Sequence, residues 1–372
     1  MFVHRLSRPM LFSLACFLLF GLPGSAAGES DERRLLYVAE PGIRNYLEYG
    51  GHGILVFDID NGHEFVKRIP IGGFDDNGKP LNVKGVCANA KTKRIYVSTL
   101  KHMMCLDLVT EEMLWEYTYV QGCDRMSMSP DGKFIYLPTL EKDHWKVVDG
   151  ETGKEIARVS PNSGSHNTVV GLDGNFAYLA GLRSPMLTVT RSSDHTVAKT
   201  VGPFSDSIRP FTVNGKQTRV YVNVNKLLGF EIGDLETGKM LQRVEVQGFK
   251  MGKVKRHGCP SHGIGMTPDE KEIWVSDGHN SRIHIFDATV SPPKQVASIE
   301  LRDQPGWVTF TLKGDLAYPS TGDVIDVRTR KIVARLTDEK GRMVQSEKLL
   351  EIDFRGDQPV RAGDQFGLGR VQ

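Results

Sequence analysis

Six ionisable side chains occupy equivalent positions along the chain, and with Gly306 they recur at intervals of 40 to 53 residues. They are Lys84, Asp124, His166, Arg209, His262 and Glu347. Histidine and carboxylate side chains are the ligands that divalent transition metals prefer, whereas lysine and arginine bind carboxylates and phosphates. If the fold brings these residues together, metal binding and anion binding are both open to the site.

The residues around these positions form a repeat of four strand-like segments. Examples are "SPDGKFIYLPTLEKDHWKVVDGETGKEIARV" and "GKQTRVYVNVNKLLGFEIGDLETGKMLQRVEV", each preceded by a short apolar segment. The single spacing of 53 residues contains an insertion, "VQGFKMGKVKRHGC", ahead of His262. A period of about 40 to 45 residues with four strands is typical of a β-propeller blade.

The ends of the chain supply the last blade. Residues 35–41, 54–60 and 63–71 read as three strands that lack an innermost one, and residues 346–354 read as a lone strand. Pairing this lone strand with 35–41 closes the ring and leaves no long open edge. The sequence therefore predicts an all-β fold: a seven-bladed β-propeller with four antiparallel strands per blade, occupying residues 28–369 and followed by a tail, 370–372.

In such a ring the innermost strands line the channel, and their first residues meet at one mouth. The predicted ligand-binding residues are Lys84, Asp124, Arg125, Arg209, Trp307 and Glu347. The predicted metal ligands are His166, His262, Asp124 and Glu347. A solvated channel in which charges of opposite sign satisfy one another through water is the alternative interpretation.

The segment His257-Gly-Cys-Pro-Ser-His262 contains two histidines and a cysteine. No second cysteine follows at a short spacing, so a local zinc knuckle is not favoured, and His262 is interpreted as a member of the ring. The mature chain would carry four cysteines. Mostly free thiols are expected, and Cys123 with Cys259 is the one pair that the fold would allow.

Residues 1–27 resemble a secretion signal. Arg5 and Arg8 precede an apolar run from Met10 to Leu22, and small residues follow near Ala27. Without this segment the chain carries 45 basic and 45 acidic residues, because two of its 47 basic residues are removed. We therefore expect an exported protein, periplasmic or extracellular, without a transmembrane segment or affinity for nucleic acid.

Several cofactor motifs are missing from the sequence. There is no C-x-x-C-H motif, no G-x-x-x-x-G-K-[ST] loop, no G-x-S-x-G elbow and no strand–helix unit for a dinucleotide site. Neither covalent haem nor a nucleotide is expected, which leaves a divalent metal ion as the cofactor to consider.

The segments "VYVNVNKLLGFEIGDLETGKMLQRVEV" and "IWVSDGHNSRIHIFDA" resemble the YVTN-type repeat of secreted YncE-like propellers. The resemblance covers nearly the whole mature chain and implies seven blades and export. It implies no reaction, because the role of that family is mostly undefined. The repeats also depart from the asparagine-rich pattern, with Ser98, Thr139 and Gly181 in its place.

These observations favour a monomeric binding or scaffold protein that takes a small polar or anionic ligand, or an envelope protein, at the channel mouth. The alternative is a lactonase-like hydrolase or lyase with His166 and His262 as catalytic residues. A metal held by these histidines would activate water, or His166 would act as a general base while Arg209 and Lys84 stabilise an anion.

Overall fold

The structure is a computed structural model that describes residues 1–2 and 32–372. The predicted signal segment, 1–27, lies outside the described residues apart from its first two. The described parts contain no helix of the length and apolar character needed to cross a membrane.

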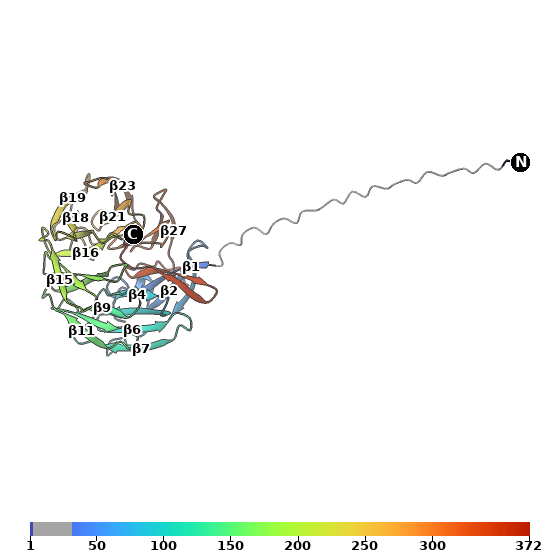
Figure 1. The fold of residues 1–372 in the computed structure, drawn as a ribbon, viewed down its shortest axis with the longest axis horizontal. Helices are drawn as coiled ribbons and strands as arrows, with labels where there is room; N and C mark the ends of the chain where they lie inside the picture. Colours follow the sequence, from blue (N-terminus) through green and yellow to red (C-terminus); the bar gives the residue numbers. More distant parts are fainter. Residues whose placement is uncertain (3–31) are drawn as a thin grey trace. The chain divides into compact units, whose positions relative to one another are not determined.

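Seven antiparallel sheets follow one another around a central axis, in the colour order of the chain (Figure 1). The innermost strands are β28 (Leu349–Arg355), β4 (Val83–Asn89), β8 (Ser127–Met128), β12 (Ser165–Val170), β16 (Ile208–Val213), β20 (Ile264–Met266) and β24 (Val308–Phe310). The second strands are β1 (Glu32–Glu40), β5 (Arg94–Thr99), β9 (Phe134–Pro138), β13 (Phe176–Gly181), β17 (Arg219–Val224), β21 (Glu272–Asp277) and β25 (Leu316–Pro319).

The third strands are β2 (Gly53–Asp58), β6 (His102–Asp107), β10 (Trp145–Asp149), β14 (Leu187–Arg191), β18 (Gly229–Asp234), β22 (Arg282–Asp287) and β26 (Asp323–Asp326). The outer strands are β3 (Glu64–Ile69), β7 (Met113–Thr118), β11 (Glu155–Val159), β15 (Val197–Val201), β19 (Met240–Glu245), β23 (Lys294–Glu300) and β27 (Lys331–Arg335). Among the described residues the only helical element is η1 (Leu47–Tyr49), a single 3-10 turn. The predicted seven-bladed all-β fold is confirmed.

The hydrophobic core lies between neighbouring blades. One cluster joins Tyr37 and Val56 of the first blade to Val86 and Ile95 of the second, and similar clusters follow around the ring. Inner strands such as β12 are buried along their whole length, whereas outer strands such as β27 alternate between exposed and half-buried residues. This gradient is expected because each sheet is covered on both faces near the axis and opens to solvent at the rim.

The connections between third and outer strands follow from the repeated Asp-x-x-Thr-Gly pattern. In the third blade the Asp149 carboxylate accepts hydrogen bonds from the backbone N–H groups of Glu151 and Thr152, at 3.1 and 2.7 Å. Gly153 follows with a φ of 71°, which a residue with a side chain adopts at a cost. These residues therefore fix where the third strand ends and the outer strand begins.

The ring closes as expected, because β28 pairs with β1 in antiparallel register from Glu32 opposite Arg355 to Val38 opposite Leu349. A fifth strand, β29 (Gln358–Ala362), extends this sheet beyond β28. The sequence analysis did not predict β29, because the other repeats contain no equivalent segment.

The C-terminal segment, residues 363–370, crosses the channel further along the inner strands than the ring positions. Gln365 bonds to the backbone of Val86 and Met126 in the second and third blades. The Gly367 carbonyl accepts hydrogen bonds from Thr212 and Met266 in the fifth and sixth. The end of the chain accordingly lies inside the ring (Figure 1), and this segment limits the depth of the channel below the mouth.

Candidate functional site

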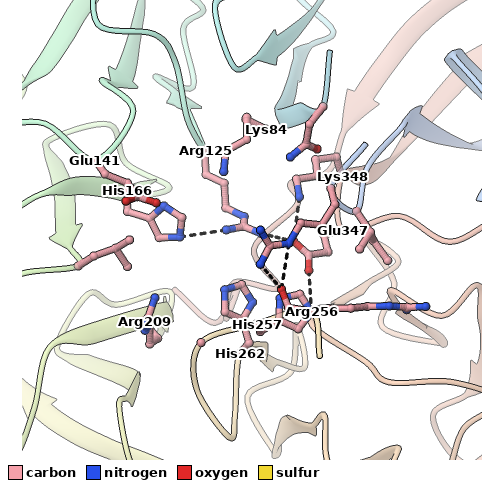
Figure 2. Close-up of a pocket in the computed structure, with 15 residues that line it drawn as sticks. Lys84, Arg125, Glu141, His166, Arg209, Arg256, His257, His262, Glu347 and Lys348 are labelled. Atoms are coloured by element: carbon pink, nitrogen blue, oxygen red, sulfur yellow. Dashed lines mark hydrogen bonds and ion pairs between the residues drawn. The ribbon is translucent and has the colours of Figure 1, made fainter. Parts of the chain in front are cut away.

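Five of the six ionisable ring residues, all except Asp124, line one cavity of about 160 Å³ at the mouth. Lys84 on β4, His166 on β12 and Arg209 on β16 line it from within strands, and Arg125, His262 and Glu347 line it from the segments just before β8, β20 and β28. Figure 2 shows these side chains converging on the same space. Asp124 and Trp307 lie behind this wall, in contact with residues that line it.

Asp124 is fully buried and binds its neighbours with both carboxylate oxygens. Its Oδ2 lies 2.6 Å from His166 Nδ1, and its Oδ1 lies 3.2 Å from the Lys84 ammonium. Burial alone would raise the pKa of Asp124, but His166 and Lys84 outweigh it and lower that pKa. The carboxylate is therefore ionised and held between two donors.

Arg125 lies at the centre of the cavity wall and connects its two sides. Its Nη1 is 3.2 Å from His166 Nε2, its Nη2 donates to Glu347 Oε2, and its guanidinium carbon lies 4.5 Å from the centre of the Trp307 ring. Arginine can only donate, so His166 Nε2 must accept and His166 Nδ1 must carry the proton that is donated to Asp124. His166 is then a neutral imidazole with no lone pair left for a substrate, and burial lowers its pKa accordingly.

Glu347 lies on the other side of Arg125 from His166, and it is also buried. Its Oε2 accepts hydrogen bonds from Arg125 and from Lys348, the latter at 2.8 Å. Burial alone would raise the pKa of Glu347, yet Lys348 and Arg125 hold it well below its ordinary value. Its Oε1 lies 3.2 Å from His257 Nε2, but neither atom makes a hydrogen bond within the described chain.

Two histidines face Glu347. The rings of His257 and His262 stack with their centres 4.2 Å apart, and His262 Nδ1 lies 3.1 Å from the Gly306 carbonyl. A carbonyl oxygen only accepts, so His262 donates from Nδ1 and its Nε2 carries a lone pair. Burial lowers the pKa of His257 to about 4 and holds that of His262 well below its usual value, so both are neutral near pH 7.

Several cations complete the lining, and they differ in their partners. Arg256 pairs with Asp303 at 2.6 Å and also bonds to Gln345. Arg209 donates to the Asn225 side-chain oxygen at 2.6 Å, and Arg44 donates to the Arg256 carbonyl at 2.9 Å. Across residues 32–372, neither Arg209 nor Arg44 pairs with a carboxylate.

The structure separates the four predicted metal ligands into two groups. His166 and Asp124 bind each other, and His262 and Glu347 lie together on the other side of Arg125. The sequence analysis did not place Arg44, Arg256, Lys348 or His257 in the site. Of these only His257 is a potential metal ligand, and it comes from the inserted loop between β19 and β20. The His-x-x-x-x-His spacing in that insertion was the available signal.

The cysteines take no part in the cavity. Cys87, Cys105, Cys123 and Cys259 are buried free thiols, so the pair allowed by the sequence, Cys123 with Cys259, does not form. Burial raises the pKa of each of these four thiols, which keeps them protonated and unreactive.

No family model and no curated protein matches the chain. Among solved structures, 1718 chains match. One of them, described as Kuenenia stuttgartiensis hydrazine synthase, has a TM-score of 0.45 and 12% sequence identity, and the alignment covers 67% of this chain and 94% of that chain. A similarity this distant carries no inference about function or family.

Proposed function

We propose that this protein is an exported, YncE-like β-propeller that binds a small anion in the cavity at its channel mouth. The family and the export rest on the YVTN-like repeats and on the signal-like residues 1–27. The ligand class rests on the cavity. A rigid ring with a preformed polar cavity is suited to binding without rearrangement.

The observation that carries the proposal is the presence of unpaired positive charge on the cavity wall. Arg209 and Arg44 line it, and within the described residues their hydrogen-bond acceptors are an amide and a backbone carbonyl. A guanidinium with a neutral partner keeps donors free for a carboxylate or a phosphate, which it binds with two parallel hydrogen bonds. Arg209 is half-buried, so its interaction with an anion would be only partly screened by water.

The size of the cavity suits a small anion. Its volume of 160 Å³ is several times the roughly 10–15 Å³ that one water molecule needs on the same measure. Inorganic phosphate, sulfate or a short dicarboxylate fits this space. The cations on the wall outnumber the acids, since Glu141 and Glu347 are the only carboxylates among its lining residues.

The test is calorimetric titration of the EDTA-treated protein with phosphate, sulfate and succinate. We expect one of these anions to bind, and Arg209→Ala to weaken it by about 10- to 100-fold, since a hydrogen bond to a charged group contributes about 1.5–3 kcal/mol. Arg183→Ala is the matched control, because Arg183 is an exposed arginine outside the cavity lining. Binding that survives both Arg209→Ala and Arg44→Ala, or no binding of any of the three anions, contradicts the proposal.

Export has a separate test. Expression of the full chain should yield protein outside the cytoplasm, with its N-terminus near Gly28 by peptide sequencing. Protein that retains Met1 and stays in the cytoplasm would contradict this part of the proposal alone.

A further inference from the structure

We infer that His257, His262 and Glu347 form a binding site for a divalent transition-metal ion such as Zn²⁺ or Co²⁺, with the cavity supplying the open coordination position. This inference does not depend on the anion site. It rests on the positions of three ligand atoms, on the lack of hydrogen bonds to two of them within the described chain, and on the space beside Gly306.

The three residues are close enough to share one ion. Each offers one ligand atom, and these atoms all lie within 4.8 Å of one another. His257 Nε2 and Glu347 Oε1 lie 3.2 Å apart. With metal–ligand distances of about 2.0–2.1 Å, two ligand atoms of a tetrahedral ion lie about 3.3 Å apart. The separation between His257 Nε2 and Glu347 Oε1 is close to this value.

Two of the ligand atoms are buried without a hydrogen bond. Despite their 3.2 Å separation, His257 Nε2 and Glu347 Oε1 are not aligned for a hydrogen bond, and each lacks any other partner in the described chain. A buried polar atom left unpaired costs about 1–3 kcal/mol, and a bound ion would remove that cost for both atoms at once.

The third ligand and the carboxylate are held in position by neighbours. His262 donates Nδ1–H to the Gly306 carbonyl, and this bond leaves the Nε2 lone pair for an ion. Arg125 and Lys348 both bind Glu347 Oε2, which leaves Oε1 for the ion. Metal ligands in proteins are oriented by such outer contacts, and both contacts are present here.

Gly306 leaves the space that an ion needs. A Cβ at this position would lie 2.0 Å from His257 Nε2 and 2.5 Å from Glu347 Oε1. The other six ring positions carry side chains, and the seventh is a glycine at the point where these two atoms meet. Any side chain at residue 306 would therefore fill the gap between the two ligand atoms.

The three protein ligands do not fill all the coordination positions of a tetrahedral ion. Two histidines and one glutamate leave a fourth position of a tetrahedral ion open, as in catalytic rather than structural zinc sites. The Arg125 guanidinium places a positive charge beside the ligand carboxylate. This charge weakens the attraction for a cation, so we expect an affinity below that of an all-protein zinc site.

The test uses EDTA-treated full-length protein in a phosphate-free buffer at pH 7.5. Titration with CoCl₂ should produce the visible absorption of four- or five-coordinate cobalt at one ion per chain, and ZnCl₂ should displace it. His257→Ala and His262→Ala should each weaken cobalt binding at least as much as the roughly 10- to 100-fold that loss of an outer contact costs.

The matched control is His102→Gln. His102 is a half-buried histidine on β6, outside the cavity lining, so its replacement should leave cobalt binding unchanged. Gly306→Ala keeps all three ligands and fills the space between them, so it should abolish binding while far-UV circular dichroism shows an intact fold.

Three results would overturn the inference. They are no stoichiometric cobalt or zinc binding by the wild type, binding that persists in His257→Ala, and binding that is lost in His102→Gln but retained in Gly306→Ala. The anion titrations use metal-free protein and the metal titrations use no phosphate, so failure of one proposal is distinguishable from failure of the other.

Discussion

The two sides of the cavity contain the same residue types in different states of hydrogen bonding. On one side, Asp124 and His166 use both oxygens and both ring nitrogens on neighbours. On the other, Glu347 Oε1 and His257 Nε2 are buried without hydrogen bonds in the described chain. The residue types in a site therefore do not determine which ligand it can bind. The ligand depends on the polar atoms that are left without hydrogen bonds after folding, and of these two sides only that of Glu347 has such carboxylate and imidazole atoms.

The first prediction compares the loss of stability when the buried carboxylate on each side of the cavity, Glu347 or Asp124, is replaced by alanine. Glu347→Ala leaves Arg125 and Lys348 buried without their common partner, and each of these side chains is only 3% exposed. Breaking a buried pair in this way costs about 3–5 kcal/mol. Asp124→Ala orphans Lys84, which is 14% exposed and open to water, together with a neutral histidine, so we expect about 1–3 kcal/mol.

Urea unfolding of both variants measures the two costs. Glu141→Gln, which alters an exposed carboxylate of the same cavity, serves as the control and should stay close to the wild type. Equal losses for Glu347→Ala and Asp124→Ala would show that the two sides do not differ in how strongly they hold their cations.

The second prediction concerns pH. Burial lowers the pKa of His257 to about 4 in the folded protein, with Glu347 opposing and Arg125 adding to the shift, whereas an unfolded histidine has a pKa of about 6.5. As the pH falls below 6.5 the unfolded chain takes up the proton first, so stability is lost between pH 6.5 and about 4. Between pH 7 and 5, the wild type should lose about 1–2 kcal/mol more than His257→Gln.

Unfolding free energies measured at both pH values test this difference. The loss of stability at low pH should be reduced less by His166→Gln. Asp124 opposes the lowering of the His166 pKa both by its charge and by the hydrogen bond to Nδ1, whereas Glu347 opposes that of His257 by its charge alone. A His257→Gln variant as sensitive to pH as the wild type would mean that His257 is not buried as a neutral ring.

The fold was predictable because every blade repeats the same order of four strands and turns. Each sheet needs a turn after its third strand, and the aspartate, threonine and glycine that build this turn recur at Asp149 and Asp234. The ring positions followed from the same register, since equivalent residues of equivalent strands must meet at one height around an axis. Lys84, His166 and Arg209 line one cavity for that reason.

The hydrogen-bond partners within the ring could not be predicted from the sequence. Strand register shows how far along the channel a side chain lies, but it does not show which neighbour that side chain contacts. Arg125 separates His166 from His262, and only the structure shows that it bonds to both His166 and Glu347. His257 lies on an insertion without a counterpart in the other blades, so no repeat could place it. The channel-crossing segment, 363–370, had no counterpart either.

The last prediction tests Arg125, which both sides share. Its guanidinium lies 4.5 Å from the centre of the Trp307 ring, and the Trp307 indole N–H donates to the Gln365 carbonyl. Trp307→Phe and Trp307→Leu both lose this hydrogen bond, but only the phenylalanine keeps an aromatic face beneath the cation. The leucine variant should therefore be less stable than the phenylalanine variant by about 1 kcal/mol.

The same pair of variants at Trp274 provides the control, because its ring packs against Phe310 and, in the described chain, faces no guanidinium. The difference between phenylalanine and leucine should be smaller there in thermal or urea unfolding. If the two positions give equal differences, the Trp307 ring acts on Arg125 only as an apolar surface. The orientation of Arg125, and with it the separation of the two sides, then depends on Glu347 and His166 alone.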